Sequence, residues 1–198
     1  MGRKEKAAET EAALKAAAKR VFAERGYLNT KITDITAEAG RSTGSFYSHF
    51  SSKEALLEAL MADMGADSDM MSHDADHSAD FTDPDAIRFH VAAYISVYRR
   101  HSETVRAMQQ ALLVSEQFAA RLAEFRSSAL SDILDHITSV ATAGRQLPAS
   151  PENSLRIAFA MLDTALESRQ QGEIDLDDTQ LIEALTRFLY RGLNGCDY

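Results

Sequence analysis

The chain has 198 residues, of which 45% are hydrophobic and 26% are charged, and it contains one cysteine, Cys196. This apolar content is enough for one or two compact units, and no run of about 18 apolar residues is present to span a membrane. A lone Cys excludes an internal disulfide, so we expect an inert thiol in a reducing cytoplasm. The polar start, Met-Gly-Arg-Lys-Glu-Lys, leads us to expect no secretory signal.

The net charge of -9 is unevenly distributed along the chain. Residues 1–60 contain ten Lys and Arg against eight Asp and Glu, whereas residues 61–198 contain eleven against twenty-two. Every Lys lies at or before Lys53. A basic end on an acidic body suits phosphate binding by that end, because counterion release requires cations only where the duplex lies. Charge segregation on a solvated surface is the alternative that composition leaves open.

A first helix is predicted over 9–25, because apolar residues recur there at the spacing of one helix face. That stripe consists of Leu14, Ala17, Ala18, Val21 and Phe22. Gly26 follows it as an expected left-handed C-cap. The preceding basic residues form either a flexible arm that reaches DNA or a disordered solubilising tail; they are Arg3, Lys4 and Lys6.

Two short helices are predicted next. Thr33 is expected to cap the second helix, and Ser42 is expected to cap a third helix over 43–50. Phe46 and Phe50 lie four residues apart, so both point to the same side of the third helix and anchor it inward.

A fourth helix is predicted to start from a capping box of Ser51 and Glu54. Its expected buried face is Leu56, Leu57, Leu60, Met61 and Met64. The segment 65–85 is acidic, rich in small residues and without clear periodicity, so we interpret it as a connector that is partly helical or mobile. It contains residues with metal-ligand chemistry: His73, Asp74, Asp76, His77 and Asp80. Its composition favours a solvated acidic linker, and we predict no metal site.

Five more amphipathic helices are predicted beyond residue 85 from the same periodicity. Their apolar positions run from Ile87 to Tyr98, Val105 to Leu112, Phe118 to Val140, Leu155 to Leu166 and Leu181 to Leu189. Ser150 with Pro151 opens the fourth of these, and Asp177 or Asp178 opens the fifth. Because no alternating strand pattern competes, we predict an all-α fold of about nine helices.

The segment 32–57 contains the strongest functional signal. Two short helices joined by a tight turn containing glycine describe a helix-turn-helix, whose second helix enters the major groove. The outer face of that second helix is Thr43, Gly44, Ser45, Tyr47 and Ser48. A glycine weakens a helix by roughly 1 kcal/mol relative to Ala, so this face is not selected for stability. Small residues allow close approach of a nucleic acid, and hydroxyls can contact phosphates or base edges.

This segment resembles the N-terminal signature of the TetR family. The matching residues are Ala39-Gly40, Gly44, Phe46-Tyr47, His49-Phe50, Ser52-Lys53-Glu54 and Leu56-Leu57. The similarity covers about residues 10–60, and beyond residue 60 only the number and spacing of helices are similar. The resemblance implies a bacterial regulator that binds a near-palindromic operator in double-stranded DNA as a homodimer.

The resemblance also implies roles for single residues. Tyr47 is expected to anchor phosphate through its hydroxyl. Lys53 and Thr33 are expected to contact phosphate near helix N-termini, where the helix dipole favours anions. The positions expected to face the groove are Ser42, Thr43, Gly44 and Ser45.

Two positions keep alternative interpretations. His49 matches the family's histidine at the end of the recognition helix, where it either packs beside the backbone or contacts DNA directly. Arg41 occupies a position where the family usually has a small aliphatic residue. That arginine either adds a phosphate contact or solvates the turn between the two helices.

For the rest of the chain, the resemblance implies an effector cavity enclosed by the helices between 87 and 140. It also implies a four-helix bundle in which the last two helices, the eighth and ninth, pair with those of a second chain. Candidate pocket residues are His90, Tyr94, Tyr98, Met108, Phe125 and His136. The competing interpretation is core packing for the aromatic and Met side chains and partly buried, satisfied positions for the histidines. No cofactor is expected.

We therefore expect a DNA-binding domain over 1–52 that the fourth helix joins to an effector-binding and dimerisation domain over 53–198. The favoured function is a ligand-responsive regulator, a repressor that a small molecule releases from its operator. An architectural DNA-binding protein without an effector is one alternative, and a helical small-molecule-binding protein or enzyme is another. The sequence contains no Gly-rich phosphate loop or assignable Ser/His/Asp arrangement, so we expect no enzymatic activity.

Overall fold

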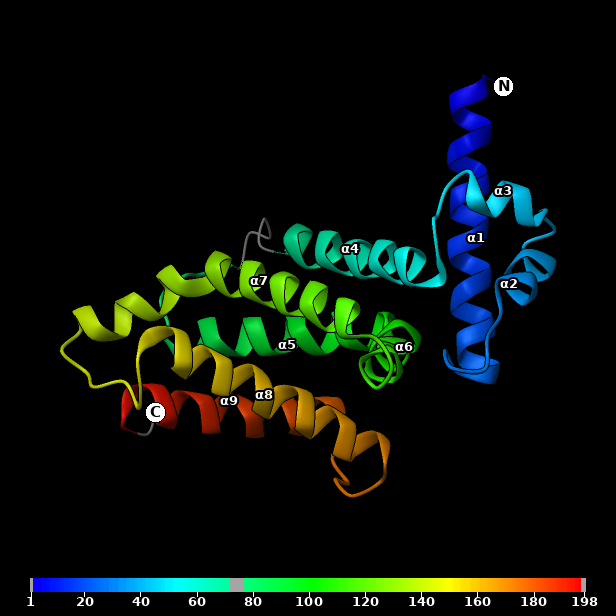
Figure 1. Ribbon diagram of the computed structural model, residues 1–198. Coiled ribbons are helices and arrows are strands. Elements are labelled where there is room, and N and C mark those ends of the chain that lie inside the picture. Colours follow the sequence, from blue (N-terminus) through cyan, green and yellow to red (C-terminus); the bar gives the residue numbers. More distant parts are fainter. Residues whose placement is uncertain (1, 72–76, 197–198) are drawn as a thin grey trace. The chain divides into compact units, whose positions relative to one another are not determined.

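The computed structural model describes residues 2–71 and 77–196, and Figure 1 traces their helices. Nine helices and no strand are present in these residues, which confirms the all-α prediction for this part of the chain. In chain order the helices are α1 (Arg3–Arg25), α2 (Ile32–Glu38), α3 (Thr43–Tyr47), α4 (Lys53–Met71), α5 (Pro84–Arg100), α6 (Ser102–Leu112), α7 (Glu116–Thr142), α8 (Pro151–Gln170) and α9 (Asp178–Asn194).

The helices divide into two compact units. The first consists of Met1–Ala66 and Tyr98–Glu124, and the second of Asp67–Val97 and Phe125–Tyr198. The chain therefore passes from one unit to the other within α4, α5 and α7. These units do not separate after residue 52, because α6 packs on α1 and joins the helix-turn-helix residues. The division at 52 remains a prediction about how function is distributed.

The core of the first unit forms around the predicted stripe of α1. All five residues of that stripe are buried, and so are Ile35, Phe46 and Phe50. Burial of one such large side chain contributes about 1.5–3 kcal/mol. Helices of seven and five residues are too short to be stable alone, so α2 and α3 are held by this packing.

The second and third helices differ from prediction at one end each. α2 begins at Ile32, and its N-cap is Lys31, whose backbone N–H donates to the Asp34 carboxylate at 2.8 Å. Thr33 therefore lies in the first turn of α2 and is not its cap. The third helix ends at Tyr47 and not at residue 50, because the chain tightens into turns at the next two residues.

The predicted cap of α3 is confirmed, and the predicted cap of α4 is wrong by one residue. The Ser42 hydroxyl accepts a hydrogen bond from the Ser45 backbone N–H at 3.1 Å. For α4 the accepting hydroxyl is that of Ser52, at 3.1 Å from the Ala55 backbone nitrogen, and not that of Ser51. The hydroxyl of an N-cap residue accepts from the backbone N–H of the second or third helical residue. Because α4 begins at Lys53, the N-cap position is Ser52 and the third helical residue is Ala55.

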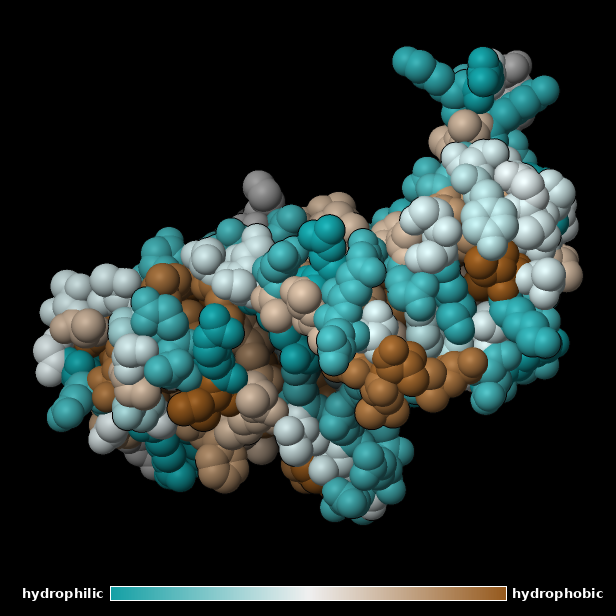
Figure 2. Space-filling model, in the orientation of Figure 1, coloured by the Kyte–Doolittle hydropathy of each residue, from teal (hydrophilic) through white to brown (hydrophobic). Residues whose placement is uncertain are grey.

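The N-terminal basic residues belong to a helix. Arg3, Lys4 and Lys6 lie in the first turns of α1, so the prediction of a flexible arm or disordered tail is wrong. The Gly2 backbone nitrogen donates to the Glu5 carboxylate at 2.6 Å and thereby caps this start. Figure 2 shows hydrophilic side chains around these first turns. Helix α1 ends at Arg25, and its C-cap is Gly26, whose φ is positive at 75° but whose ψ of 158° lies outside the expected left-handed helical region.

The second unit packs α8 and α9 against each other, with a buried apolar face on both helices. Their predicted starts are confirmed: Ser150 caps α8 with Pro151 in its first turn, and Asp177 caps α9. Arg88 of α5 contacts Glu183 of α9 at 3.2 Å. In the described residues, no helix combines the length and apolar character that a membrane span requires.

The segment 65–85, predicted as a connector that is partly helical or mobile, is helical at both ends. α4 continues to Met71, and α5 begins at Pro84. Residues 77–83 are irregular, and the backbone N–H of Phe81 in this segment donates to the Ser139 hydroxyl of α7 at 3.0 Å. The Phe81 carbonyl accepts from the side-chain amide of Asn194 in α9 at 3.0 Å. His73, Asp74 and Asp76 lie outside the described residues.

Candidate nucleic-acid interface and effector-binding residues

The recognition helix α3 has one buried side and one exposed side. Phe46 is fully buried, and its ring lies 5.7 Å from that of Phe50. On the other side Tyr47 is 57% exposed, and Thr43 and Gly44 are exposed as well. The helix therefore presents the hydroxyl and glycine face that the sequence analysis assigned to the groove.

Neither packing within the chain nor backbone conformation explains why residue 44 is a glycine. Apart from the adjoining residues and the backbone of the helix itself, the one described atom within 4 Å of a Cβ placed on Gly44 is the Ser42 hydroxyl oxygen, at an ordinary van der Waals distance of 3.8 Å. The backbone at this position is helical and lies outside the positive-φ region. The absent side chain instead leaves the exposed backbone of α3 open to a close partner.

Lys53 makes contacts inside the first unit. Its ammonium donates to the carbonyls of Tyr27 and Thr30 at 2.7 and 2.8 Å, and it lies 4.1 Å from the centre of the Tyr27 ring. Burial lowers the pKa of Lys53, an effect that the nearby Glu54 partly offsets. These two hydrogen bonds use two of the three donors of the ammonium. Lys53 therefore ties the start of α4 to the turn between α1 and α2.

Arg41 and His49 both turn towards α1. The Arg41 guanidinium lies 3.4 Å from the Glu9 carboxylate, and its side chain is 33% exposed. The His49 imidazole lies 3.9 Å from the Glu11 carboxylate, and its side chain is 15% exposed. The limited exposure of His49 favours the packing interpretation over direct contact with DNA. Thr33 and Ser42, by contrast, are exposed.

A residue that sequence reasoning missed supports the turn before α2. Gln110 of α6 accepts a hydrogen bond from the Leu28 backbone N–H at 3.3 Å. The same side-chain oxygen lies 2.9 Å from the position that a Cβ on Gly26 would occupy. No local sequence pattern could have identified Gln110, because the contact joins residues 82 positions apart.

The six candidate pocket residues are divided between the two units. The first unit contains Tyr98 and Met108, both buried, and the second contains His90, Tyr94, Phe125 and His136. Within the second unit, the Tyr94 hydroxyl donates to the Asp163 carboxylate, and its ring lies 5.4 Å from that of Phe159. Asp163 is thus a polar group beside a candidate pocket residue that the sequence analysis did not select.

The two candidate histidines lie close together and meet a third. His90 and His136 have ring centres 4.9 Å apart, and His77 lies 5.1 Å from each. Burial, together with the neighbouring imidazoles, lowers the pKa of His90 to about 4, although a hydrogen bond to the Ala86 carbonyl opposes the shift. His90 is therefore neutral at neutral pH. The sequence pointed to each histidine separately, His77 for its metal-ligand chemistry and the other two as pocket candidates, but no local pattern indicated that the three meet.

An open depression of about 460 Å³ lies along α1, and none of the candidate pocket residues lines it. Its lining is mostly alanine and charged side chains: Ala8, Glu11, Ala12, Lys15, Ala16, Lys19 and Asp63. The ion pair between Lys15 and Asp63, at 2.8 Å, joins α1 to α4 across it. Such a lining is unsuited to an apolar effector.

The three-helix arrangement of α1 to α3, with an exposed α3, defines a helix-turn-helix protein. Residues 14–60 match the family model described as bacterial regulatory proteins, tetR family. The chain is 30% identical to the regulator EthR of Mycolicibacterium smegmatis over 148 residues, which is 72% of this chain and 64% of EthR. The helix-turn-helix region of the chain is therefore that of the TetR family.

Solved structures share the fold. The fatty acid degradation regulator FadR from Bacillus halodurans is similar with a TM-score of 0.77 at 18% identity, over 98% of this chain and 97% of that one. FadR from Bacillus subtilis, in complex with stearoyl-CoA, is similar with a TM-score of 0.76 at 18% identity, over 91% of this chain and 98% of that one. The chain spans 64% or less of the length of the curated relatives it matches.

Proposed function

We propose that this chain is a ligand-responsive DNA-binding transcriptional regulator, specifically a repressor that a small molecule releases from a near-palindromic operator. The observation that carries the proposal is the exposed face of α3, where Tyr47, Thr43 and Gly44 are solvent-facing while Phe46 is fixed in the core. Such a regulator is not an enzyme, and it acts in the cytoplasm, where bacterial DNA lies.

In this proposal the side chains around α3 divide into two roles. Ser42, Thr43, Gly44 and Ser45 face base edges in the major groove, and Tyr47 anchors a phosphate through its exposed hydroxyl. Thr33 and Arg41 lie at the edge of this face and contact neighbouring phosphates. Lys53 acts mainly by fixing the turn between α1 and α2, which sets the position of α2 and α3. His49 supports α3 from the side of α1.

We infer a homodimer formed through α8 and α9. The supporting observation is that each helix leaves a large apolar side chain in solvent: Ile157 of α8 is 61% exposed, and Phe188 of α9 is 70% exposed. Burial of one Phe contributes about 1.5–3 kcal/mol, and a two-fold interface buries it twice. The Phe188→Asp variant is therefore expected to dissociate at concentrations where the wild type is dimeric.

Sedimentation equilibrium or light scattering measures this change. Leu113→Asp is the matched control, because Leu113 is 77% exposed and apolar but lies in the turn after α6. A dimer that persists in Phe188→Asp, or one that is lost equally in Leu113→Asp, contradicts the assignment of the interface to α8 and α9. A monomeric wild type that binds its operator one chain per site contradicts dimerisation altogether.

The effector is proposed to be an apolar or mixed-polarity small molecule bound among α5 to α8. It releases DNA only if it binds more tightly to a conformation whose recognition helices do not fit successive grooves. α4 suits the transmission of such a change, because one continuous helix contributes residues to both units. A coupling of ~1–3 kcal/mol corresponds to a change of roughly 5–150-fold in operator affinity.

The proposed function is tested by fluorescence anisotropy with the DNA that flanks the gene of this protein. We expect a preferred fragment bound by a dimer, with half-sites about one DNA turn apart or a multiple of it. A thermal-shift screen that includes long-chain acyl-CoAs then supplies compounds to add to the bound complex. Equal affinity for all sequences without a responsive compound favours the alternative, an architectural DNA-binding protein. Compounds that stabilise the protein but leave operator affinity unchanged contradict the coupling.

A further inference from the structure

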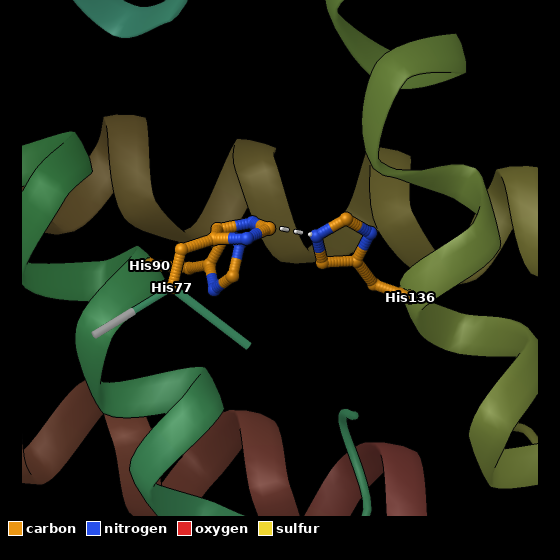
Figure 3. A group of neighbouring side chains, drawn as sticks. All are labelled: His77, His90 and His136. Atoms are coloured by element: carbon orange, nitrogen blue, oxygen red, sulfur yellow. Dashed lines mark hydrogen bonds between the residues drawn. The ribbon is translucent and has the colours of Figure 1, made fainter. Parts of the chain in front are cut away.

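Three histidines from three parts of the second unit converge on one point. His77 lies in the segment before α5, His90 in α5 and His136 in α7. Figure 3 shows their imidazole rings facing one another. One ring nitrogen of each lies within 4.8 Å of the corresponding nitrogens of the other two, and the Nε2 atoms of His77 and His136 are 3.0 Å apart. The group arises from tertiary packing, because its members are separated by 13 and 46 positions in the sequence.

In two of these rings, the hydrogen-bond partner determines which nitrogen carries the proton and which carries the lone pair. The Nδ1 atom of His90 lies 2.8 Å from the Ala86 carbonyl, and Nδ1 of His136 lies 2.5 Å from the Asp135 carboxylate. A carbonyl and an ionised carboxylate only accept hydrogen bonds, so both Nδ1 atoms donate. The lone pair of each neutral ring is therefore on Nε2. Histidines that ligate metals characteristically donate their second nitrogen in this way, which fixes the ring and raises its basicity.

The surroundings hold the group in place. Phe81 packs against His90 and His136 at ring-centre distances of 5.0 and 5.4 Å, and Phe89 packs against His77 at 5.9 Å. The Phe81 backbone is hydrogen-bonded through both its N–H and its carbonyl, to α7 and α9 respectively. An apolar, restrained setting of this kind strengthens coordination by limiting solvent access and ring rotation.

We propose that His77, His90 and His136 bind one borderline transition-metal ion, Zn²⁺ in preference, through three imidazole nitrogens. Neutral imidazole suits Zn²⁺, Ni²⁺ and Cu²⁺, whereas Mg²⁺ requires oxygen ligands. Tetrahedral Zn²⁺ with bonds of about 2.0–2.1 Å places its ligand nitrogens ~3.4 Å apart, so the three rings reach it by small side-chain rotations. The ion takes the place of the hydrogen bond between His77 and His136, and the ring proton that His77 donates in that bond moves to its other nitrogen by exchange with solvent, so that all three imidazoles coordinate in neutral form. Its fourth position is open to water or a small ligand.

This site goes beyond DNA binding and does not depend on it, so its test requires only the purified full-length protein. Zn²⁺ is added to chelator-treated protein and its affinity measured by competition with a chromophoric chelator, and Co²⁺ is used as a visible probe of coordination. We expect one Zn²⁺ per chain, the absorption of four-coordinate Co²⁺, and no competition by excess Mg²⁺. His90→Ala and His136→Gln are expected to abolish the stoichiometric binding, and His77→Gln to weaken it severely.

Two further variants distinguish a built site from general attraction to acidic residues. Asp135 is 76% exposed, so Asp135→Asn leaves the fold and all three ligands intact; it is expected to weaken Zn²⁺ binding by about 10–100-fold. Asp83→Asn is the control, since it removes an exposed carboxylate from residues 77–83, the segment that contains His77. The side-chain oxygen of the new Asn can still accept a hydrogen bond from the Asp85 N–H. This variant is expected to bind as the wild type does. Circular dichroism and melting of each metal-free variant establish that it is folded.

Three results overturn the proposal. If the wild-type protein shows no saturable Zn²⁺ binding, the three rings are a hydrogen-bonded aromatic cluster of the core and not a metal site. Binding that persists in folded His90→Ala and His136→Gln protein assigns the metal to other residues. Binding that Mg²⁺ displaces, or that Asp83→Asn weakens as much as Asp135→Asn does, indicates attraction to acidic side chains alone. If His136→Gln does not fold, the wild-type, His77→Gln and Asp135→Asn titrations still decide the question.

Discussion

Substitution of Gly44 by alanine separates the stability of α3 from its proposed contact with DNA. The new methyl group lies 3.8 Å from the Ser42 hydroxyl oxygen, which is an ordinary van der Waals contact. The backbone is already helical, so alanine is the better residue there by about 0.8–1.0 kcal/mol. We therefore expect Gly44→Ala to leave the free energy of unfolding unchanged or to raise it by up to ~1 kcal/mol.

The effect on DNA binding has the opposite sign. If the exposed backbone of α3 packs against the groove, a methyl group at Gly44 lies in a close-packed interface, where overpacking costs about 1–3 kcal/mol. That cost corresponds to a loss of roughly 5–150-fold in operator affinity. A variant that is as stable as the wild type or more stable, yet binds its operator more weakly, has no explanation in the folding of the monomer.

Urea unfolding and fluorescence anisotropy on the same preparations measure both quantities. Ser131→Ala is the matched control, because it also replaces a weak helix former by alanine at an exposed position, in α7 of the second unit. Its stability is expected to rise slightly and its operator affinity to stay unchanged. Wild-type operator affinity in Gly44→Ala refutes the close approach of DNA at this residue, and a large loss of stability refutes our account of its surroundings.

Three other substitutions test the supporting contacts. Tyr47→Phe is expected to keep wild-type stability and to weaken binding to operator and unrelated DNA alike, because it removes one exposed hydroxyl; a changed sequence ranking in anisotropy assays contradicts a phosphate contact. Lys53→Met leaves two carbonyls without their donor and is expected to lower the free energy of unfolding by about 1–3 kcal/mol in urea titrations, and an unchanged value argues against the internal role. Gly26→Ala forces a side chain to φ of 75° and ψ of 158°, a conformation almost confined to glycine, and is expected to lower stability by about 1–3 kcal/mol; full rescue by Gln110→Ala contradicts the backbone origin of the loss.

Local sequence determined the helices and the position of the recognition helix. Apolar spacing and capping residues are short-range signals, so the stripe of α1, the cap at Ser42 and the start of α8 at Ser150 were predictable. The glycine and hydroxyl face of α3 was also predictable, because it departs from what helix stability alone selects. The errors at Thr33 and at Ser51 are shifts of one or two residues, which depend on side-chain geometry that periodicity does not describe.

Tertiary structure decided which distant side chains meet. Lys53 was expected to contact phosphate, and only the fold brings its ammonium to two carbonyls in the turn between α1 and α2. Asp163 reaches Tyr94, and His77 reaches His90 and His136, across separations that no sequence pattern encodes. The physical reason is that helix periodicity specifies which face of each helix is buried but not which face of another helix lies opposite. That choice depends on the packing of all helices together, and it created the histidine group.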